Sequence, residues 1–174
     1  MLNVLIAGVG GQGSVLAAKI LAQAATAKGW QVRTAETIGM AQRGGNVLSH
    51  VRMGNFGERV YAPLVAQGQA DCIIALEPGE GLRALPYLAQ QGLLVSAQTG
   101  IASVTAGLSG SPYVPEDALA SLKAQVSNFV VVDDAAICNA AGSRKALNIG
   151  LLAAAIRYSI EKDCGLGNAI RSEE

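Results

Sequence analysis

The sequence has few charged residues, and this shortage excludes several kinds of partner. Charged residues make up 15% of the 174 residues, and 13 basic and 13 acidic side chains give a net charge of zero. A usual charged fraction is about 25%. Since Lys and Arg are scattered, we expect neither nucleic acid nor a membrane as a partner. The low charge and the mean hydropathy of +0.34 indicate either a surface covered by other chains or a compact, alanine-rich α/β domain, and composition leaves both open.

Cysteine is also scarce, at Cys72, Cys138 and Cys164. Without a C-x-x-C pair these residues cannot alone supply the ligands of an iron–sulfur cluster or a structural zinc site. Free thiols are typical of the cytoplasm, and no basic, apolar leader is visible. The longest apolar run, Ile149 to Ile156, is much shorter than the about 20 residues that span a bilayer. We therefore expect a cytoplasmic chain.

We expect no metal site in this chain. The adjacent Asp133 and Asp134 follow a predicted strand, but they supply fewer oxygen ligands than a metal ion requires. Acids at this position commonly cap the helix that follows.

A strand, a glycine turn and a helix follow one another directly at the start of the chain. Val4 to Ala7 is apolar, positions 8–13 read G-V-G-G-Q-G, and Ser14 to Lys28 has helical spacing. This succession is the entry unit of a doubly wound α/β domain. Helix-start N–H groups favour anions, so the turn is a candidate anion site. Its residues are Gly8 for a tight turn, Gly10 for close approach to the anion, Gly13 for helix–strand packing, and Gly11 and Gln12.

Glu36 ends the next predicted strand, Gln31 to Glu36, and lies 23 positions after Gly13. Dinucleotide-binding domains place an acid near this position to bond the ribose hydroxyls. The alternative is a carboxylate that bonds nearby loop N–H groups. We favour the alternative because the next residues do not continue like a cofactor domain.

A second glycine loop, at positions 37–46, follows that strand. Open α/β sheets place their sites at this end of a strand. An anion-binding nest, a bidentate arginine and two amides are available there, from Gln42, Arg43, Gly44, Gly45 and Asn46. The alternative is a tight turn in which Arg43 pairs with Glu36.

A β-hairpin is predicted next, with Val47 to Arg52 as one strand and Arg59 to Ala62 as the other. His50, the only histidine, is expected to be a hydrogen-bonded structural residue rather than a base or a metal ligand. Ser49 is its neighbour and points to the opposite face of the strand, so the two form no nucleophile–base pair.

The rest of the chain alternates between strands and helices. Strands are predicted at 71–76, 93–96 and 129–132, and helices at 80–90, 115–123, 135–141 and 144–160. We predict one three-layer α/β/α Rossmann-like domain over residues 1–161, with a mostly parallel, mixed sheet and an inserted β-hairpin, followed by a tail at 162–174. Glu77 and Asn148 should lie on the same rim as the glycine turn.

These motifs together resemble a known family. They are G-V-G-G-Q-G at 8–13, Glu36, G-M-A-Q-R-G-G at 39–45, S-H-V-R at 49–52, G-Q-A-D at 68–71, Glu77-Pro78 with Arg83, and Asn148. They are similar to the gamma-type subunit of 2-oxoacid:ferredoxin oxidoreductases, and most similar to the small (beta) subunit of the indolepyruvate type. The resemblance extends to about residue 160.

The resemblance implies a multi-subunit enzyme that converts a 2-oxo acid and coenzyme A into an acyl-CoA and passes electrons to ferredoxin. It implies that thiamine diphosphate with Mg²⁺ and the iron–sulfur clusters are held by partner subunits, and that the isolated chain is inactive. We assign no catalytic residue to this chain. We expect the glycine turn and Arg43 to face coenzyme A phosphates, and we expect a rim or interface role for Glu36, Met40, Gln42, Asn46, Ser49, His50, Glu77 and Asn148.

Two other functions remain open, and so does the substrate. One alternative is an autonomous NAD(P)- or FAD-binding Rossmann oxidoreductase, and the other is a non-catalytic nucleotide-binding module. Within the resembled family the 2-oxo acid could be indolepyruvate, ketoisovalerate, pyruvate or 2-oxoglutarate.

Overall fold

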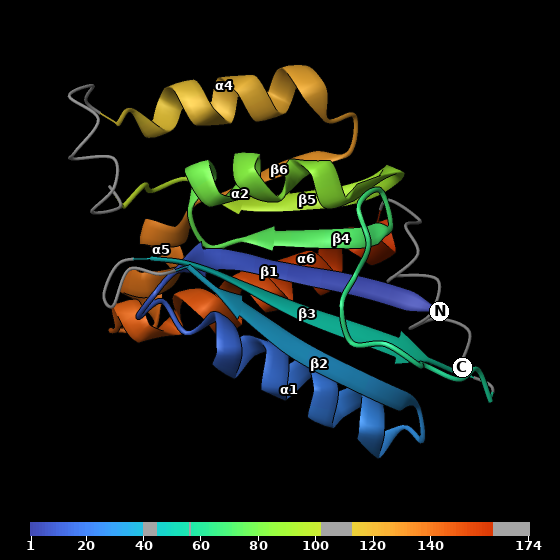
Figure 1. Ribbon diagram of the computed structural model, residues 1–174. Helices are drawn as coiled ribbons and strands as arrows, with labels where there is room; N and C mark the ends of the chain where they lie inside the picture. Colours follow the sequence, from blue (N-terminus) through green and yellow to red (C-terminus); the bar gives the residue numbers. More distant parts are fainter. Residues whose placement is uncertain (40–44, 56, 102–112, 162–174) are drawn as a thin grey trace.

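A six-stranded sheet lies between two layers of helices in the computed structural model, which describes residues 1–39, 45–55, 57–101 and 113–161 (Figure 1). The strands are β1 (Leu2–Val9), β2 (Gln31–Ile38), β3 (Asn46–Gly54), β4 (Ala70–Ala75), β5 (Leu88–Ala97) and β6 (Phe129–Val132). The helices are α1 (Ser14–Ala27), α2 (Pro78–Ala84), α4 (Pro115–Gln125), α5 (Asp134–Ala140) and α6 (Leu147–Glu161), with 3-10 turns at Leu85–Tyr87 and Arg144–Ala146. The predicted three-layer α/β/α architecture is confirmed.

The sheet is mixed and mostly parallel, as predicted. Its strand order is β2-β3-β1-β4-β5-β6. Strands β1, β4, β5 and β6 pair in parallel, whereas β3 is antiparallel to both β1 and β2. Because β3 lies between β1 and β2, the strand that follows α1 is displaced from β1 by one further strand.

The position predicted for the hairpin is wrong. Residues 59–62 form no strand, and the hairpin partner of β3 is the preceding strand β2. Residues 57–69, called the strap here, instead run beside β3 without joining the sheet. Pro63 lies in the middle of the strap and has no N–H to donate to a strand partner. Hydrogen bonds from side chains of the sheet hold the strap instead.

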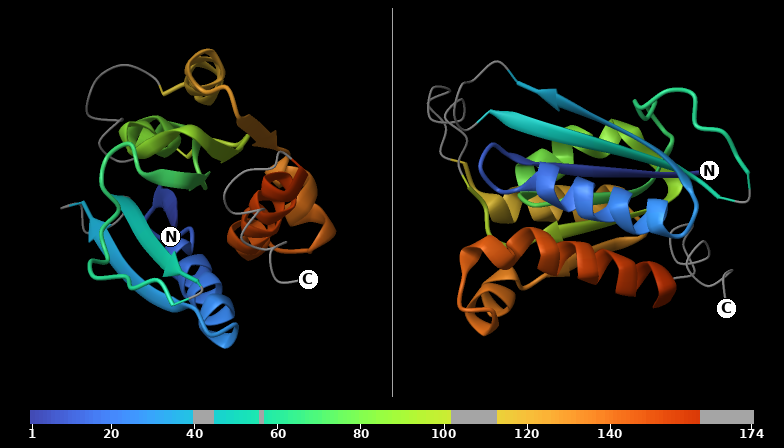
Figure 2. Two further views of the ribbon diagram at one scale, coloured as in Figure 1. Left: turned by 90° about the vertical axis from the view of Figure 1, so that its right-hand side faces the viewer. Right: turned by 90° about the horizontal axis from the view of Figure 1, so that it is seen from below.

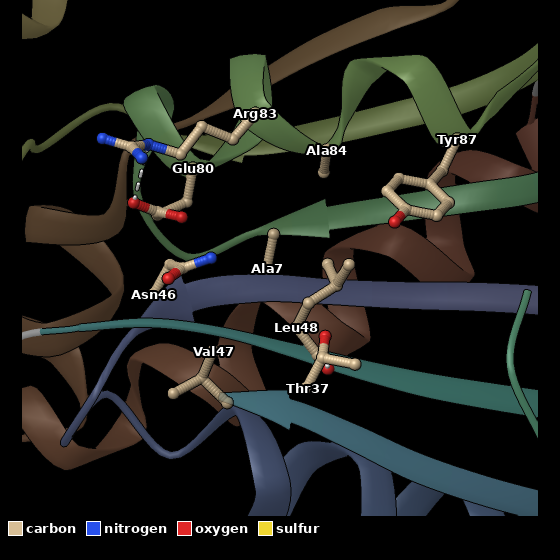
Figure 3. A pocket seen from close by; sticks show the side chains of 9 residues that line it. All are labelled: Ala7, Thr37, Asn46, Val47, Leu48, Glu80, Arg83, Ala84 and Tyr87. Atoms are coloured by element: carbon tan, nitrogen blue, oxygen red, sulfur yellow. Dashed lines mark hydrogen bonds and ion pairs between the residues drawn. The ribbon is translucent and has the colours of Figure 1, made fainter. Parts of the chain in front are cut away.

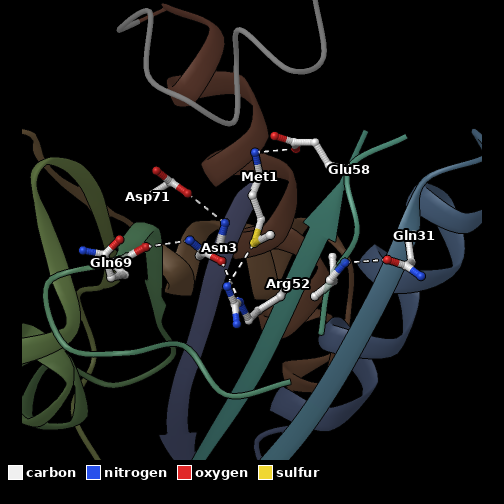
Figure 4. A network of polar contacts seen from close by, with 8 residues as sticks. Met1, Asn3, Gln31, Arg52, Glu58, Gln69 and Asp71 are labelled. Carbon is white, nitrogen blue, oxygen red and sulfur yellow. Dashed lines mark hydrogen bonds and ion pairs between the residues drawn. The ribbon is translucent and has the colours of Figure 1, made fainter. Parts of the chain in front are cut away.

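Arg52 and Asn3 hold the strap at the amino-terminal end of β1 (Figure 4). The Arg52 guanidinium donates to the Ala62 carbonyl at 2.9 Å and to the Asn3 side-chain oxygen at 3.0 Å. The Asn3 amide donates in turn to the Gln69 carbonyl at 2.9 Å. These bonds satisfy backbone groups that a strand partner would otherwise satisfy.

The predicted helix at 80–90 is also too long. Helix α2 ends at Ala84, a 3-10 turn follows, and β5 begins at Leu88. Pro86 accounts for the difference, since it has no N–H to continue the helical hydrogen bonds, although Leu85 before it still has helical backbone angles.

The core has two parts, one on each face of the sheet, and Figure 2 shows the helical layers that cover them. Helices α1 and α6 contribute Ala17, Leu21, Leu151 and Ala155 to one part. Helices α2 and α4 contribute Ala84 and Leu122 to the other. Within the described ranges, no helix is long and apolar enough to cross a membrane.

Candidate functional site

The two glycine loops meet at the carboxyl end of β1. The Gly10 N–H donates to the Gly45 carbonyl at 2.9 Å, and the Gly39 N–H donates to the Asn46 carbonyl at 2.8 Å across the start of β3. The described residues of the two loops are therefore in direct contact. Met40, Gln42, Arg43 and Gly44 lie outside those residues.

Gln12 ties the first glycine turn to the end of β4. Its side-chain oxygen accepts from the Val9 N–H at 2.7 Å, and its amide donates to the Leu76 carbonyl at 2.9 Å. A Cβ on Gly8 would lie 2.9 Å from that Gln12 oxygen and 3.2 Å from the Leu76 side chain. Gly8 thus allows the close approach of Gln12 and Leu76, while the tight turn predicted for it comes after Val9.

The start of α1 is open and has no side-chain cap. Gly13 is the N-cap residue with φ of 83°, no side chain caps this end, and the first turn contains no acidic residue. Gly11 has φ of 100°, and no described atom lies within 4 Å of the position that its Cβ would take. The N–H groups of a first helical turn carry partial positive charge, so this end of α1 is suited to an anion.

Asn148 occupies the space that a side chain at Gly13 would fill. Its amide nitrogen donates to the Gly13 carbonyl at 3.0 Å and would lie 2.4 Å from a Cβ on Gly13. The side chain is buried. Gly13 therefore makes room for α6, rather than for the helix–strand packing predicted for it.

Glu77 is 2% exposed on the same rim and organises the start of α2. Its carboxylate accepts from the Glu80 N–H at 2.9 Å and from the Tyr113 hydroxyl. The Tyr113 oxygen accepts from the Gly79 N–H at 2.9 Å. Burial and the bond to Glu77 raise the pKa of the Tyr113 phenol, so this hydroxyl stays protonated and remains a donor.

The sequence gives no signal for Tyr113, because this residue follows a connection without apolar periodicity.

Asp133 and Asp134 were both considered as caps of the helix that follows them. Buried Asp134 accepts from the Gln98 and Thr99 N–H groups at 2.9 and 2.8 Å, just after β5. Asp133 caps α5 through the Ala136 N–H at 2.9 Å. The capping prediction is therefore confirmed for Asp133, whereas Asp134 bonds the end of β5.

Glu36 lies within β2 rather than at its end. It pairs with Ser49, which pairs with Ile6 in the middle of β1. It is exposed and lies one strand beyond β3, which adds about 4.8 Å to its separation from β1. The acid of a dinucleotide domain lies beside the glycine turn, so this geometry does not support the ribose-binding alternative.

His50 and Ser49 also lie within the sheet, away from the rim. His50 is buried, its Nδ1 accepts from the Val65 N–H at 3.1 Å, and its ring meets that of Tyr87 edge-on at 6.1 Å. Burial lowers the pKa of His50, which keeps the ring neutral and able to accept. His50 is hydrogen-bonded, as predicted, and an interface role for His50 and Ser49 stays a prediction. The Ser49 hydroxyl has no hydrogen-bond partner among the described residues.

No three His, Cys, Asp or Glu side chains cluster to form a metal site among residues 1–39, 45–55, 57–101 and 113–161. The rim offers backbone N–H groups and glycine surface instead. The described part of the rim can hold an anion, but it contains no arrangement of acid, base and nucleophile.

Comparison with known proteins decides the family. Residues 3–167 match the family model described as pyruvate ferredoxin/flavodoxin oxidoreductase. The chain belongs to this family. It is 42% identical over 150 residues to an indolepyruvate oxidoreductase subunit IorB from Archaeoglobus fulgidus, covering 85% of this chain and 72% of that one. The IorB of Thermococcus kodakarensis is 36% identical over 154 residues, covering 87% and 75%.

Solved structures share the fold of this oxidoreductase subunit. A keto/oxoacid ferredoxin oxidoreductase gamma subunit from Geobacter sulfurreducens superposes with a TM-score of 0.59 at 19% identity, covering 94% of this chain and 85% of that one. Pyruvate oxidoreductase subunit PORC from Thermotoga maritima gives a TM-score of 0.59 at 20% identity, covering 99% and 85%. At these identities the likeness concerns the fold alone.

The predicted resemblance is thus confirmed. The chain is a small subunit of a 2-oxoacid:ferredoxin oxidoreductase, and its enzyme class is that of the complex. These findings favour the subunit function over an autonomous NAD(P)- or FAD-dependent enzyme and over a separate nucleotide-binding module.

Proposed function

We propose that this subunit supports oxidation of an aryl pyruvate, indolepyruvate first, to the corresponding acyl-CoA. In this reaction the 2-oxo acid and coenzyme A yield acyl-CoA, CO₂ and a proton, and two electrons pass to ferredoxin. Identities of 42% and 36% to subunits named for indolepyruvate support this choice of substrate. Pyruvate, ketoisovalerate and 2-oxoglutarate are the competing substrates.

The proposed partners are subunits that carry thiamine diphosphate with Mg²⁺ and the iron–sulfur clusters, with ferredoxin as the electron acceptor and the cytoplasm as the location. Thiamine diphosphate supplies the carbanion chemistry of such a reaction. The residues of this chain contribute binding and shape. Its three cysteines are too few for a four-thiolate cluster.

The open start of α1, together with the Gly8–Gly13 turn, is the proposed contact for the phosphates of coenzyme A, and Arg43, Gly44 and Gly45 are the further residues predicted to contribute to it. One observation carries this proposal: a 14-residue helix begins without a side-chain cap or an acid, next to Gly11, whose Cβ position has no described atom within 4 Å. Such a helix start favours a phosphate.

Leu16 allows a direct test, because it lies in the first turn of α1 and is 53% exposed. In the assembled enzyme we expect Leu16→Glu to weaken coenzyme A affinity about fivefold, measured by calorimetry, since a carboxylate there repels phosphate by about 1 kcal/mol. The matched Leu16→Gln variant should stay within about twofold of wild type. Helix stability should not fall in Leu16→Glu, because an acid in the first turn favours the helix.

Arg43→Ala is the second variant and should also weaken coenzyme A binding. If Leu16→Glu and Arg43→Ala both bind coenzyme A as wild type does, the phosphate contact lies elsewhere. The substrate is tested separately with a viologen acceptor, where kcat/KM for indolepyruvate should exceed those for ketoisovalerate, pyruvate and 2-oxoglutarate. A higher kcat/KM for any of these three would overturn the substrate assignment.

A further inference from the structure

A pocket that none of these functions uses lies between α2 and the β2–β3 hairpin (Figure 3). We call it the α2 pocket. Its volume is about 180 Å³, whereas one water molecule needs only about 15 Å³. Its apolar lining is Ala7, Val47, Leu48 and Ala84, and its polar lining is Thr37, Asn46, Glu80, Arg83 and Tyr87.

The end of the α2 pocket nearest the rim carries a buried carboxyl group. The side chain of Glu80 is only 6% exposed, and its Oε1 lies 3.4 Å from Nε of Arg83, which is 59% exposed. This separation is too long for a strong charge-assisted hydrogen bond. Burial is the main cause that raises the pKa of Glu80, nearby Glu77 adds to it, and Arg83 only partly offsets it. Arg83 therefore compensates the charge of the Glu80 carboxylate only in part, and a second cation beside it would stabilise the ionised form.

The shape of the pocket defines what can reach Glu80. The lining places apolar surface from Leu48 and Ala84 along the pocket and the Glu80 carboxylate at the end nearest the rim. Figure 3 also shows the Tyr87 hydroxyl directed toward Leu48, where it offers a second acceptor. A short aliphatic stem ending in an ammonium or guanidinium matches this sequence of surfaces, as the side chains of lysine and arginine do.

The position of the pocket points to another chain as the source of this cation. Helices α2 and α4 cover β1, β4, β5 and β6, while β2 and β3 carry no helix on this face within the described residues, and the strap covers only the part of β3 around His50 and Arg52. The chain is one subunit of a complex, so the part of this face that neither a helix nor the strap covers is available to a partner subunit. We infer that the α2 pocket receives a lysine or arginine side chain from a partner subunit, with its cationic head at Glu80.

Opposite effects at two neighbouring residues test this inference in the co-expressed complex. Glu80→Gln should weaken association of this chain with its partner subunits at least about tenfold, because a buried cation loses its counter-charge. Arg83→Met should leave association unchanged or tighten it, because Arg83 competes for the same carboxylate. Glu116→Gln, at an exposed acid in α4, is the matched control and should not change it. Weaker association in Arg83→Met with unchanged or tighter association in Glu80→Gln would indicate an anionic occupant and overturn the inference, as would wild-type association in both.

A second measurement uses the full chain alone, and so does not depend on how the variants fold in the complex. We expect n-butylguanidinium to shift the Tyr87 ring resonances of the wild-type chain and pentanoate, with a stem of similar length, not to do so. A shift with pentanoate only, or with neither, contradicts the inference. If n-butylguanidinium binds through Glu80 but Glu80→Gln assembles normally, the pocket takes a small free cation and the assignment to a partner is wrong. Coenzyme A affinity is not part of either measurement, so the proposed phosphate contact is tested independently.

Discussion

At the scale of single residues, Gly13 and Asn148 form one contact between segments 135 residues apart. The Gly13 carbonyl accepts from the Ala17 N–H at 3.1 Å within α1 and from the Asn148 amide at 3.0 Å. Because the amide lies where a Cβ would be, the missing side chain sets how closely α6 approaches the glycine turn. This contact fixes the start of α1, which is the proposed phosphate contact.

We expect Gly13→Ala to destabilise the chain by about 2–5 kcal/mol in urea unfolding. A left-handed alanine costs about 1–2 kcal/mol, and a displaced buried amide costs about 1–3 kcal/mol. Gly29→Ala is the control, since Gly29 has φ of 80° and no described atom within 4 Å of its Cβ position. It should show only the conformational cost. Equal losses in the two variants would mean that the Asn148 contact contributes little.

At the scale of elements, the strap takes the place of the predicted second hairpin strand. His50 binds its middle, through the Val65 N–H, and Arg52 binds its Ala62 and Leu64 carbonyls. The strap therefore depends on a neutral histidine, because a protonated Nδ1 cannot accept a hydrogen bond. This dependence makes the stability of the chain sensitive to pH.

We expect His50 to lower the free energy of unfolding as the pH falls below about 6.5. Burial lowers the pKa of the folded histidine, so below its ordinary value of about 6.5 the unfolded chain binds the proton and the folded chain does not. The contribution is complete above this pH and is lost below it, with a slope of at most about 1.4 kcal/mol per pH unit.

His50→Asn is the comparison, because its side-chain oxygen can still accept from Val65 and does not titrate. Burial raises the pKa values of Asp71 and Glu80, and these carboxyls act in the opposite direction in both proteins. The difference between wild type and His50→Asn in urea midpoints from pH 7.5 to 5 therefore reports His50 alone. Parallel pH profiles would show that His50 does not control the strap.

At the scale of the whole molecule, the low charge and the lack of a covering helix on one face of β2 and β3 both fit a chain that works inside a complex. The charged fraction is 15%, and part of one sheet face carries no helix within the described residues. A partner that binds only the folded subunit raises its apparent stability by mass action.

We expect the isolated full chain to show no turnover of indolepyruvate with coenzyme A and viologen, because the described part contains neither a metal cluster nor a set of catalytic side chains. Co-expression with the partner subunits should restore turnover, and adding them should raise the melting temperature of this chain. Turnover by the isolated chain, at a rate proportional to its concentration, would contradict the subunit function.

Local patterns predicted the α/β class, the mixed sheet and most of the helices and strands. Strand β6 was placed correctly at 129–132 because four apolar residues precede two acids. The single domain over 1–161 and the tail that follows stay predictions. The hairpin error arose because Val47 to Arg52 alternates in the same way whichever strand pairs with it, and β-pairing is decided by distant segments.

The candidate site, too, was predicted from the sequence only in part. Glycine spacing and strand ends in the sequence were enough to place the Gly8–Gly13 turn, Glu77 and Asn148 on one rim, because parallel strands end at the same edge of a sheet. Tertiary structure alone decided that β3 separates Glu36 from that rim, that Asn148 fills the space at Gly13, and that Glu80 is buried in a pocket. These outcomes depend on contacts between residues far apart in the chain, and local patterns carry no information about which distant side chain will fill a given space.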